Sequence, residues 1–133
     1  MNRISKEQYY MGIAKAVSKR STCIRRQYGA VIVKDDRIVS TGYNGNPRGT
    51  ENCIDVGKCY RIENDIPHGT QYETCKAVHA EQNAIINARE DLKGAALYLY
   101  GEENGEEIYA IPCSICFNMI KNTCIEKVIN TIF

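Results

Sequence analysis

Hydrophobic positions along the chain switch between helical and extended spacing. Tyr9, Ile13 and Val17 recur on one face of a helix, and Ser5 and Gln8 fit the capping box that begins one. β-Branched residues instead run together on both sides of a Lys-Asp-Asp-Arg turn, which predicts a β-hairpin. In chain order, these patterns predict a helix over 5–19, strands over 30–33 and 38–42, a helix over 78–89, a strand over 95–100, a helix over 113–121 and a strand over 126–132.

This order of elements predicts an α/β domain in which helices cover a mixed sheet. A hairpin comes first, and the last strand–helix–strand unit is expected to be parallel and right-handed. A chain of 133 residues is long enough for one core, so we expect a single domain over 1–133. Two Gly-rich, polar stretches, 45–74 and 101–111, are the expected insertions.

Composition narrows the class of protein. The formal net charge of +1 gives no general reason to expect a nucleic-acid or membrane partner. The polar start of the chain has no apolar run suited to a signal peptide or a spanning helix, so we expect a cytoplasmic protein. In that compartment the seven cysteines are expected to be reduced thiols or metal ligands rather than disulfides.

Two short motifs together predict a catalytic zinc site. His79, Cys113 and Cys116 offer one imidazole and two thiolates, which fill three of the four positions of a tetrahedral zinc ion. Catalytic zinc sites keep the fourth position for water, and Glu81 adds a carboxylate that need not touch the metal. A lone Cys-x-x-Cys is also typical of a redox pair or of two buried thiols. The upstream His-x-Glu and the Pro before Cys113 favour the metal, because the combined pattern is the signature of zinc nucleobase deaminases.

On these motifs the chain resembles the cytidine and deoxycytidylate deaminase superfamily, and within it the dCMP branch. The resemblance extends from about Ser18 to Ile129. The segments that carry it are Tyr-Gly-Ala-Val-Ile-Val at 28–33, Gly-Tyr-Asn-Gly-Asn-Pro-Arg-Gly at 42–49, His-Ala-Glu-Gln-Asn-Ala-Ile at 79–85 and Pro-Cys-Ser-Ile-Cys at 112–116. It implies a three-layer α/β/α cytidine-deaminase-like fold, C-terminally shortened because the chain ends directly after the last expected strand.

The resemblance implies a zinc-dependent hydrolase that converts dCMP and water to dUMP and ammonia. Glu81 would take a proton from water, pass it to the ring nitrogen and then protonate the leaving amine. The partners implied are a nucleotide substrate and further copies of the chain, as a dimer or hexamer. Two alternatives stay open: a deaminase of another nucleobase, including tRNA adenosine, and a zinc-stabilised regulatory module without turnover.

Substrate contacts are expected from five residues. By resemblance, the side chain of Asn44 reaches the sugar and the backbone of Ala80 binds the pyrimidine carbonyl, although Asn44 also suits a turn before Gly45. Arg26 is a candidate for the 5′-phosphate. Arg25 and Arg48 are further candidates for a phosphate or an effector nucleotide, and the alternative for these cations is a solvated basic surface.

Two further expectations concern the insertions. Some dCMP deaminases hold a second, structural zinc, and the positions that match its ligands by resemblance are Cys23, Cys53, Cys75 and His68. The alternative for the cysteines is ordinary buried thiols. The acidic insertion at 101–111 is expected to cover the pocket or form an extra hairpin, with Tyr109 placed to stack on a base.

Overall fold

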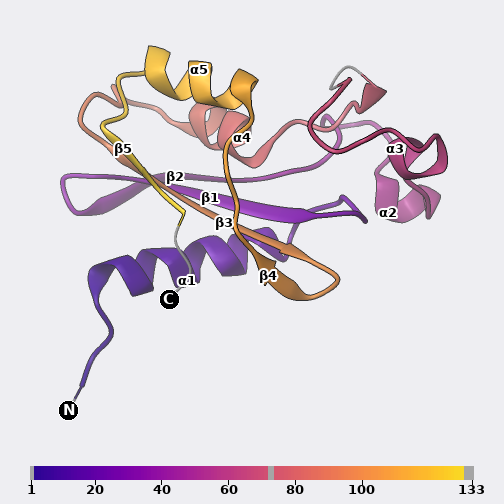
Figure 1. Ribbon diagram of the computed structural model, residues 1–133. Coiled ribbons are helices and arrows are strands. Elements are labelled where there is room, and N and C mark those ends of the chain that lie inside the picture. The colour runs from indigo at the N-terminus through magenta and orange to yellow at the C-terminus, as the bar shows by residue number, and fades with distance from the viewer. Residues whose placement is uncertain (1, 72–73, 131–133) are drawn as a thin grey trace.

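A mixed sheet lies between helices on both of its faces in the computed structural model, which describes residues 2–71 and 74–130 (Figure 1). Helix α1 (Lys6–Ser18) covers one face. Helices α4 (Ala80–Asn87) and α5 (Ser114–Asn122) cover the other. The three layers confirm the predicted α/β/α fold class. No helix in the described part of the chain combines the length and apolar character needed to cross a bilayer.

The hairpin forms as predicted and makes one edge of the sheet. Strand β1 (Gln27–Lys34) pairs antiparallel with β2 (Arg37–Tyr43). The turn between them places Asp35 and Asp36 at φ 53° and 59°. Two successive positive φ values are the feature of a type I′ turn, whose twist matches that of the flanking strands.

The other edge of the sheet is shared by two short strands. On its other side β1 pairs antiparallel with β3 (Ala96–Glu103). Strand β5 (Lys127–Ile129) runs parallel along the first part of β3, and β4 (Glu106–Ile108) runs antiparallel along its last part. The parallel unit is confirmed, and the acidic insertion forms the extra hairpin. The last strand was expected over 126–132, of which residues 131–132 lie outside the described residues.

Two short helices interrupt the first insertion. They are α2 (Cys53–Val56) and α3 (Tyr60–Glu63), which Figure 1 shows beyond one end of the sheet. An isolated bridge joins Gly45 to Val78, so the chain segments that enter and leave this insertion lie side by side.

Helix α1 begins as predicted but presents a neighbouring face to the sheet. Ser5 accepts from the Gln8 amide at 3.1 Å, and the Gln8 side chain accepts from the Ser5 amide at 3.0 Å. Tyr9, expected on the inner face, is 50% exposed, whereas Tyr10 is buried. Tyr10 packs on Tyr98 with ring centroids 5.3 Å apart and donates its hydroxyl to Asp36 at 2.9 Å, contacts that select this rotation of the helix.

Helices approach the sheet most closely at two glycines. A Cβ on Gly29 would lie 2.0 Å from the Ala14 carbonyl oxygen in α1. A Cβ on Gly42 would lie 2.5 Å from the Ala80 carbonyl oxygen and 2.3 Å from the Ala84 nitrogen in α4. Backbone therefore packs directly on backbone, and any larger residue would push the helix away.

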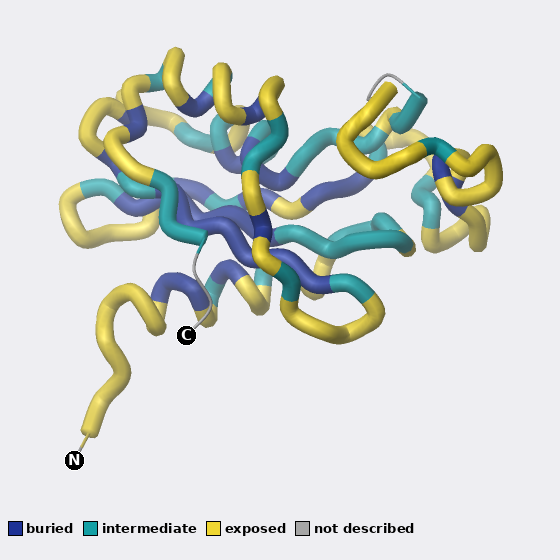
Figure 2. Tube along the Cα trace, viewed as in Figure 1, coloured by how far each residue is buried: buried dark blue, intermediate teal, exposed yellow. Residues whose placement is uncertain are grey.

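The sheet separates two hydrophobic clusters, and Figure 2 shows the buried band along its strands. The cluster under α4 and α5 includes Ile32, Leu97 and Leu99, and the cluster under α1 includes Val31 and Tyr100. Because alternate residues of β1 and β3 point to opposite faces, both strands are buried along most of their length.

Side-chain amides of α4 reach the edge strand β2. Asn83 donates to the carbonyl oxygen of Tyr43 at 2.8 Å, and Asn87 donates to that of Thr41 at 2.8 Å. The Ser40 hydroxyl also donates to the Ala84 carbonyl oxygen at 2.7 Å. Polar contacts thus add to the close approach at Gly42 in fixing α4 on the sheet.

Gly29→Ala should destabilise the fold, because its methyl group would overlap the backbone of α1. We expect a loss of about 1–3 kcal/mol in the free energy of unfolding, measured by urea titration. Gly12 is the matched control: it lies within α1, and a Cβ there would meet nothing within 4 Å. Gly12→Ala should raise stability by about 0.5–1 kcal/mol through helix propensity. Equal stability of the two variants would contradict this account of the packing.

Candidate active site

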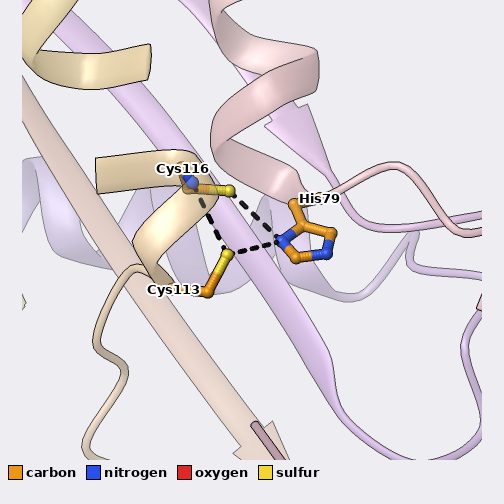
Figure 3. Close-up of side chains that lie close together, drawn as sticks. All are labelled: His79, Cys113 and Cys116. Carbon is orange, nitrogen blue, oxygen red and sulfur yellow. Dashed lines mark hydrogen bonds between the residues drawn. The ribbon is translucent and has the colours of Figure 1, made fainter. Parts of the chain in front are cut away.

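Two helices begin side by side and bring the predicted zinc ligands together (Figure 3). His79 is the N-cap residue of α4 and Cys113 that of α5, while Cys116 lies in the first turn of α5. The Nδ1 atom of His79 lies 3.5 Å from Sγ of Cys113 and 3.2 Å from Sγ of Cys116. Among the described residues, this is the one group of three or more potential ligands whose donor atoms all lie within 4.8 Å of one another.

The geometry of this group fits zinc. Bonds of about 2.3 Å to sulfur and about 2.0 Å to nitrogen place the two kinds of ligand about 3.5 Å apart around a tetrahedral ion. The observed separations of 3.2 and 3.5 Å are close to that value. Three protein ligands leave one position for water, as in catalytic rather than structural zinc sites.

The electrostatics of the site also favour a cation. Burial, and then the neighbouring carboxylate of Glu81, raise the pKa of the Cys116 thiol. Burial likewise raises the pKa of Glu81, which is only 5% exposed. Crowded acidic groups out of water are costly to ionise, and a bound divalent ion offsets that cost. The N-terminus of α5 adds its own partial positive charge beside the two thiols.

Backbone pairing around His79 fixes its position. The Val78 amide donates to the Gly45 carbonyl oxygen at 2.7 Å, and the Gly45 amide donates back at 3.1 Å. The His79 amide then donates to the Gln82 side chain at 2.8 Å, as in a capping box. His79 is therefore held on one side by the pairing of Val78 with Gly45 and on the other by the first turn of α4.

Glu81, His79 and Cys113 line a cavity of about 210 Å³ that is also lined by arginines. Arg25 and Arg26, the phosphate candidates, both line it. Arg26 donates from Nε to Oε1 of Glu103 at 3.1 Å, and its Nη1 lies 2.9 Å from Nε2 of His68. The structure therefore brings the predicted catalytic carboxylate and two predicted phosphate ligands to the same space.

Asn44 lies in the cavity wall but is mostly engaged by the protein. Its Oδ1 accepts from the Tyr28 amide at 2.9 Å and from the Ser21 hydroxyl at 2.6 Å. Its Nδ2 donates to the Arg26 carbonyl oxygen at 2.9 Å. A side-chain amide carries two N–H donors, so one donor remains for a ligand. The structural role and the predicted substrate role of Asn44 are therefore compatible.

Ala80 does not line the cavity, and its predicted backbone role stays a prediction. It is the first residue of α4, and the first four N–H groups of a helix have no acceptor inside the helix. Its side chain is fully buried against the sheet.

Two other candidates lie away from this cavity. Tyr109, which follows β4, is 62% exposed and does not line it, so the stacking of Tyr109 on a base stays a prediction that this cavity does not support. Ile111, from the same insertion, lines the cavity instead. Arg48 is exposed and lines a different cavity with Asn46 and Asn83, so it is separate from Arg26.

The four positions predicted for a second zinc do not form a group with all donor atoms within 4.8 Å of one another. His68 lies against Arg26, and the Cys53 thiol lies 3.8 Å from Nδ2 of Asn46. Cys23 and Cys75 line the cavity together with Cys59. Burial, followed by the charges of Cys59 and Cys75, raises the pKa of Cys23. The thiols are thus neighbours without lying at ligand distance, and the second zinc stays a prediction.

Among the residues of the cavity wall with polar or reactive side chains, Tyr28, Cys59 and Arg61 have no role predicted from the sequence. Tyr28 belongs to the segment 28–33 that carries the family resemblance, and its aromatic ring next to Gly29 was the feature that could have indicated a role in the site. Cys59 and Arg61 are buried in a stretch with no periodic pattern, where nothing in the sequence separates a buried position from an exposed one.

A mixed sheet that presents a His-Cys-Cys ligand group and a buried glutamate at two helix N-termini defines a zinc-dependent hydrolytic deaminase. The model of the family described as "Cytidine and deoxycytidylate deaminase zinc-binding region" matches residues 4–132. The chain belongs to this family.

Individual relatives show the same likeness. The deoxycytidylate deaminase of Mycobacterium phage D29 is 40% identical over 134 residues, which cover 97% of this chain and 96% of that protein. The deoxycytidylate deaminase of Schizosaccharomyces pombe is 35% identical over 96% of this chain, but the chain spans only 37% of that protein. The dCMP deaminase of cyanophage S-TIM5, solved in complex with dCMP and dUMP, has a TM-score of 0.70 at 27% identity, covering 96% of this chain and 82% of its own.

Glu81→Gln should abolish turnover while zinc stays bound, because the amide keeps the shape of the side chain but cannot carry a proton. We expect ammonia release to fall by about 10²–10⁴-fold, with metal content unchanged by mass spectrometry. Glu106→Gln, at an exposed carboxylate of β4, is the control and should keep full activity. Retained activity in Glu81→Gln would refute its role in proton transfer.

The second-zinc prediction is tested by metal stoichiometry. Two sites give a zinc-to-protein ratio near two, which Cys23→Ser lowers toward one while the Cys113 site stays filled. Structural zinc also contributes to folding, so Cys23→Ser should then lower the unfolding temperature. A ratio near one in the unmodified protein would exclude the second ion.

Proposed function

We propose that the protein hydrolyses dCMP to dUMP and ammonia. One observation carries the proposal: the same cavity is lined by Glu81 beside the zinc ligands and by Arg25 and Arg26. This cavity could therefore bind a cytosine base next to Glu81 and a 5′-phosphate next to the two arginines. The names of the relatives and the nucleotides in the cyanophage structure support the same substrate.

The reaction replaces the C4 amine of cytosine with oxygen. Zinc, when bound by His79, Cys113 and Cys116, supplies a Lewis acid that makes water acidic enough to react near neutral pH. Glu81 accepts a proton from the attacking water and delivers it to ring N3 as the C4–O bond forms. Glu81 then takes the remaining proton from the hydroxyl on C4 and passes it to the exocyclic amine; the C4–N bond breaks, the C4 carbonyl forms, and ammonia leaves. Burial of Glu81 keeps bulk water from competing for these protons.

Further groups near the zinc ligands are suited to binding the rest of the nucleotide. The Ala80 amide at the start of α4 is suited to the pyrimidine carbonyl, since N–H groups at a helix N-terminus favour negative charge. The remaining N–H of Asn44 is suited to a sugar hydroxyl. The Arg26 guanidinium, held by Glu103, can offer paired donors to a phosphate, with Arg25 as a second cation.

Other expectations concern the protein beyond this cavity. Arg48 lines the second cavity, so a phosphate bound there would belong to an effector nucleotide rather than to the substrate. Assembly as a dimer or hexamer, a cytoplasmic location and a single domain over 1–133 stay predictions from the sequence and the family resemblance.

Ammonia release from a panel of substrates tests the proposal. We expect the zinc-loaded protein to act on dCMP in preference to deoxycytidine, CMP and dCTP, with dUMP identified as the product by chromatography. Arg26→Gln should raise KM for dCMP by about tenfold or more, because a charged hydrogen bond to phosphate is lost. Lack of activity on all four compounds with zinc bound would contradict the proposal, and release from an adenosine-containing tRNA would instead indicate the alternative nucleobase.

A further inference from the structure

A buried arginine organises the loop that faces the phosphate candidates. Arg61 lies in the short helix α3, is only 8% exposed and lines the cavity. Arginine is rarely buried to this extent unless its donors are satisfied by specific partners. Its contacts therefore indicate what it does.

The guanidinium of Arg61 is saturated by one segment of the chain. Its Nη1 donates to the carbonyl oxygen of Gln71 at 2.6 Å and to the hydroxyl of Thr74 at 2.9 Å. Its Nη2 donates to the carbonyl oxygens of Pro67 at 2.8 Å and Thr70 at 2.5 Å. These four bonds use all four Nη hydrogens, so the two Nη groups hold the loop and have no donor left for a ligand.

The held loop carries a residue that contacts the predicted phosphate ligand. His68 and Gly69 line the cavity, and the two ring nitrogens of His68 lie 2.9 and 3.2 Å from Nη1 of Arg26. A neutral imidazole has one acceptor nitrogen, so the ring of His68 is able to accept a hydrogen bond from Arg26. Glu103 holds Nε of the same guanidinium at 3.1 Å. Arg26 is thus oriented by Glu103 of β3, by the side chain of Tyr28 and by the loop.

We propose that Arg61 is a positioning residue for recognition of the substrate's 5′-phosphate, acting through His68 on the orientation of Arg26. The inference rests on the proposed function for the identity of the substrate. A guanidinium binds phosphate best through two parallel N–H bonds, which requires a fixed plane. If the Arg26 side chain is already ordered before binding, it loses less conformational entropy when the phosphate binds, and the affinity is higher.

The test compares ligands with and without the phosphate. For zinc-loaded full-length Arg61→Gln, we expect KM for dCMP to rise about tenfold, with kcat changed by less than about twofold. Activity on deoxycytidine should stay within about twofold of the unmodified protein, because no phosphate is involved. Calorimetry with dUMP and deoxyuridine gives the same comparison without turnover, and the loss should be confined to dUMP.

Three further variants separate positioning from charge and from general stability. Arg61→Lys keeps the charge but offers three donors from one point, so it should not restore dUMP affinity. His68→Ala, at an exposed residue, should reproduce the loss, and the double variant should lose little more, because both changes act through Arg26. Arg37→Gln is the matched control: this arginine pairs with Glu90 at 2.7 Å and does not line the cavity, so phosphate discrimination should not change.

Each outcome decides between explanations. Equal losses for dUMP and deoxyuridine in Arg61→Gln, full recovery in Arg61→Lys, or unchanged discrimination in His68→Ala would overturn the inference. If Arg61→Gln does not fold, His68→Ala still decides the link to Arg26. An unmodified protein that binds dUMP but releases no ammonia from dCMP would refute the proposed function, whereas the calorimetric comparison would still test Arg61.

Discussion

The active site depends on how closely α4 approaches the sheet at Gly42. With no side chain at this position, the first turn of α4 packs directly on the backbone of β2. At that depth Glu81 is buried, and His79 reaches the two thiols at the start of α5. A contact in the packed interior therefore determines the geometry of the chemical groups, and zinc binding would in turn hold the two helix ends together.

The zinc ligands could be predicted from the sequence because metal chemistry restricts both residue type and spacing. The capping box of α1 could also be predicted, because it depends only on Ser5 and Gln8, which are three residues apart. The inner face of α1 was predicted one residue away, since Tyr10 is selected over Tyr9 by Tyr98 of β3 and Asp36 of the β1–β2 turn, which are distant in the sequence. Arg61 was not predictable, because three of its four acceptors are carbonyl oxygens, which every residue carries.

Neighbouring glutamates at the end of β3 serve opposite faces of the sheet. Glu102 accepts from Lys19, at the end of α1, at 2.6 Å, and Glu103 holds Arg26 in the cavity. Successive side chains of a strand point to opposite faces, so Glu102 contacts Lys19 on one face and Glu103 contacts Arg26 on the other. One pair of acidic residues thus links the packing of the first helix to the orientation of a binding group.

The amide side chains of α4 have a consequence for association between molecules. A strand at the edge of a sheet offers unpaired backbone groups to which a strand of another chain can bind. In β2, Asn83 and Asn87 already bond the carbonyl oxygens of Tyr43 and Thr41. An incoming strand would have to displace both amides before it could extend the sheet at this end. The helix that presents the catalytic groups therefore also protects the edge strand against aggregation.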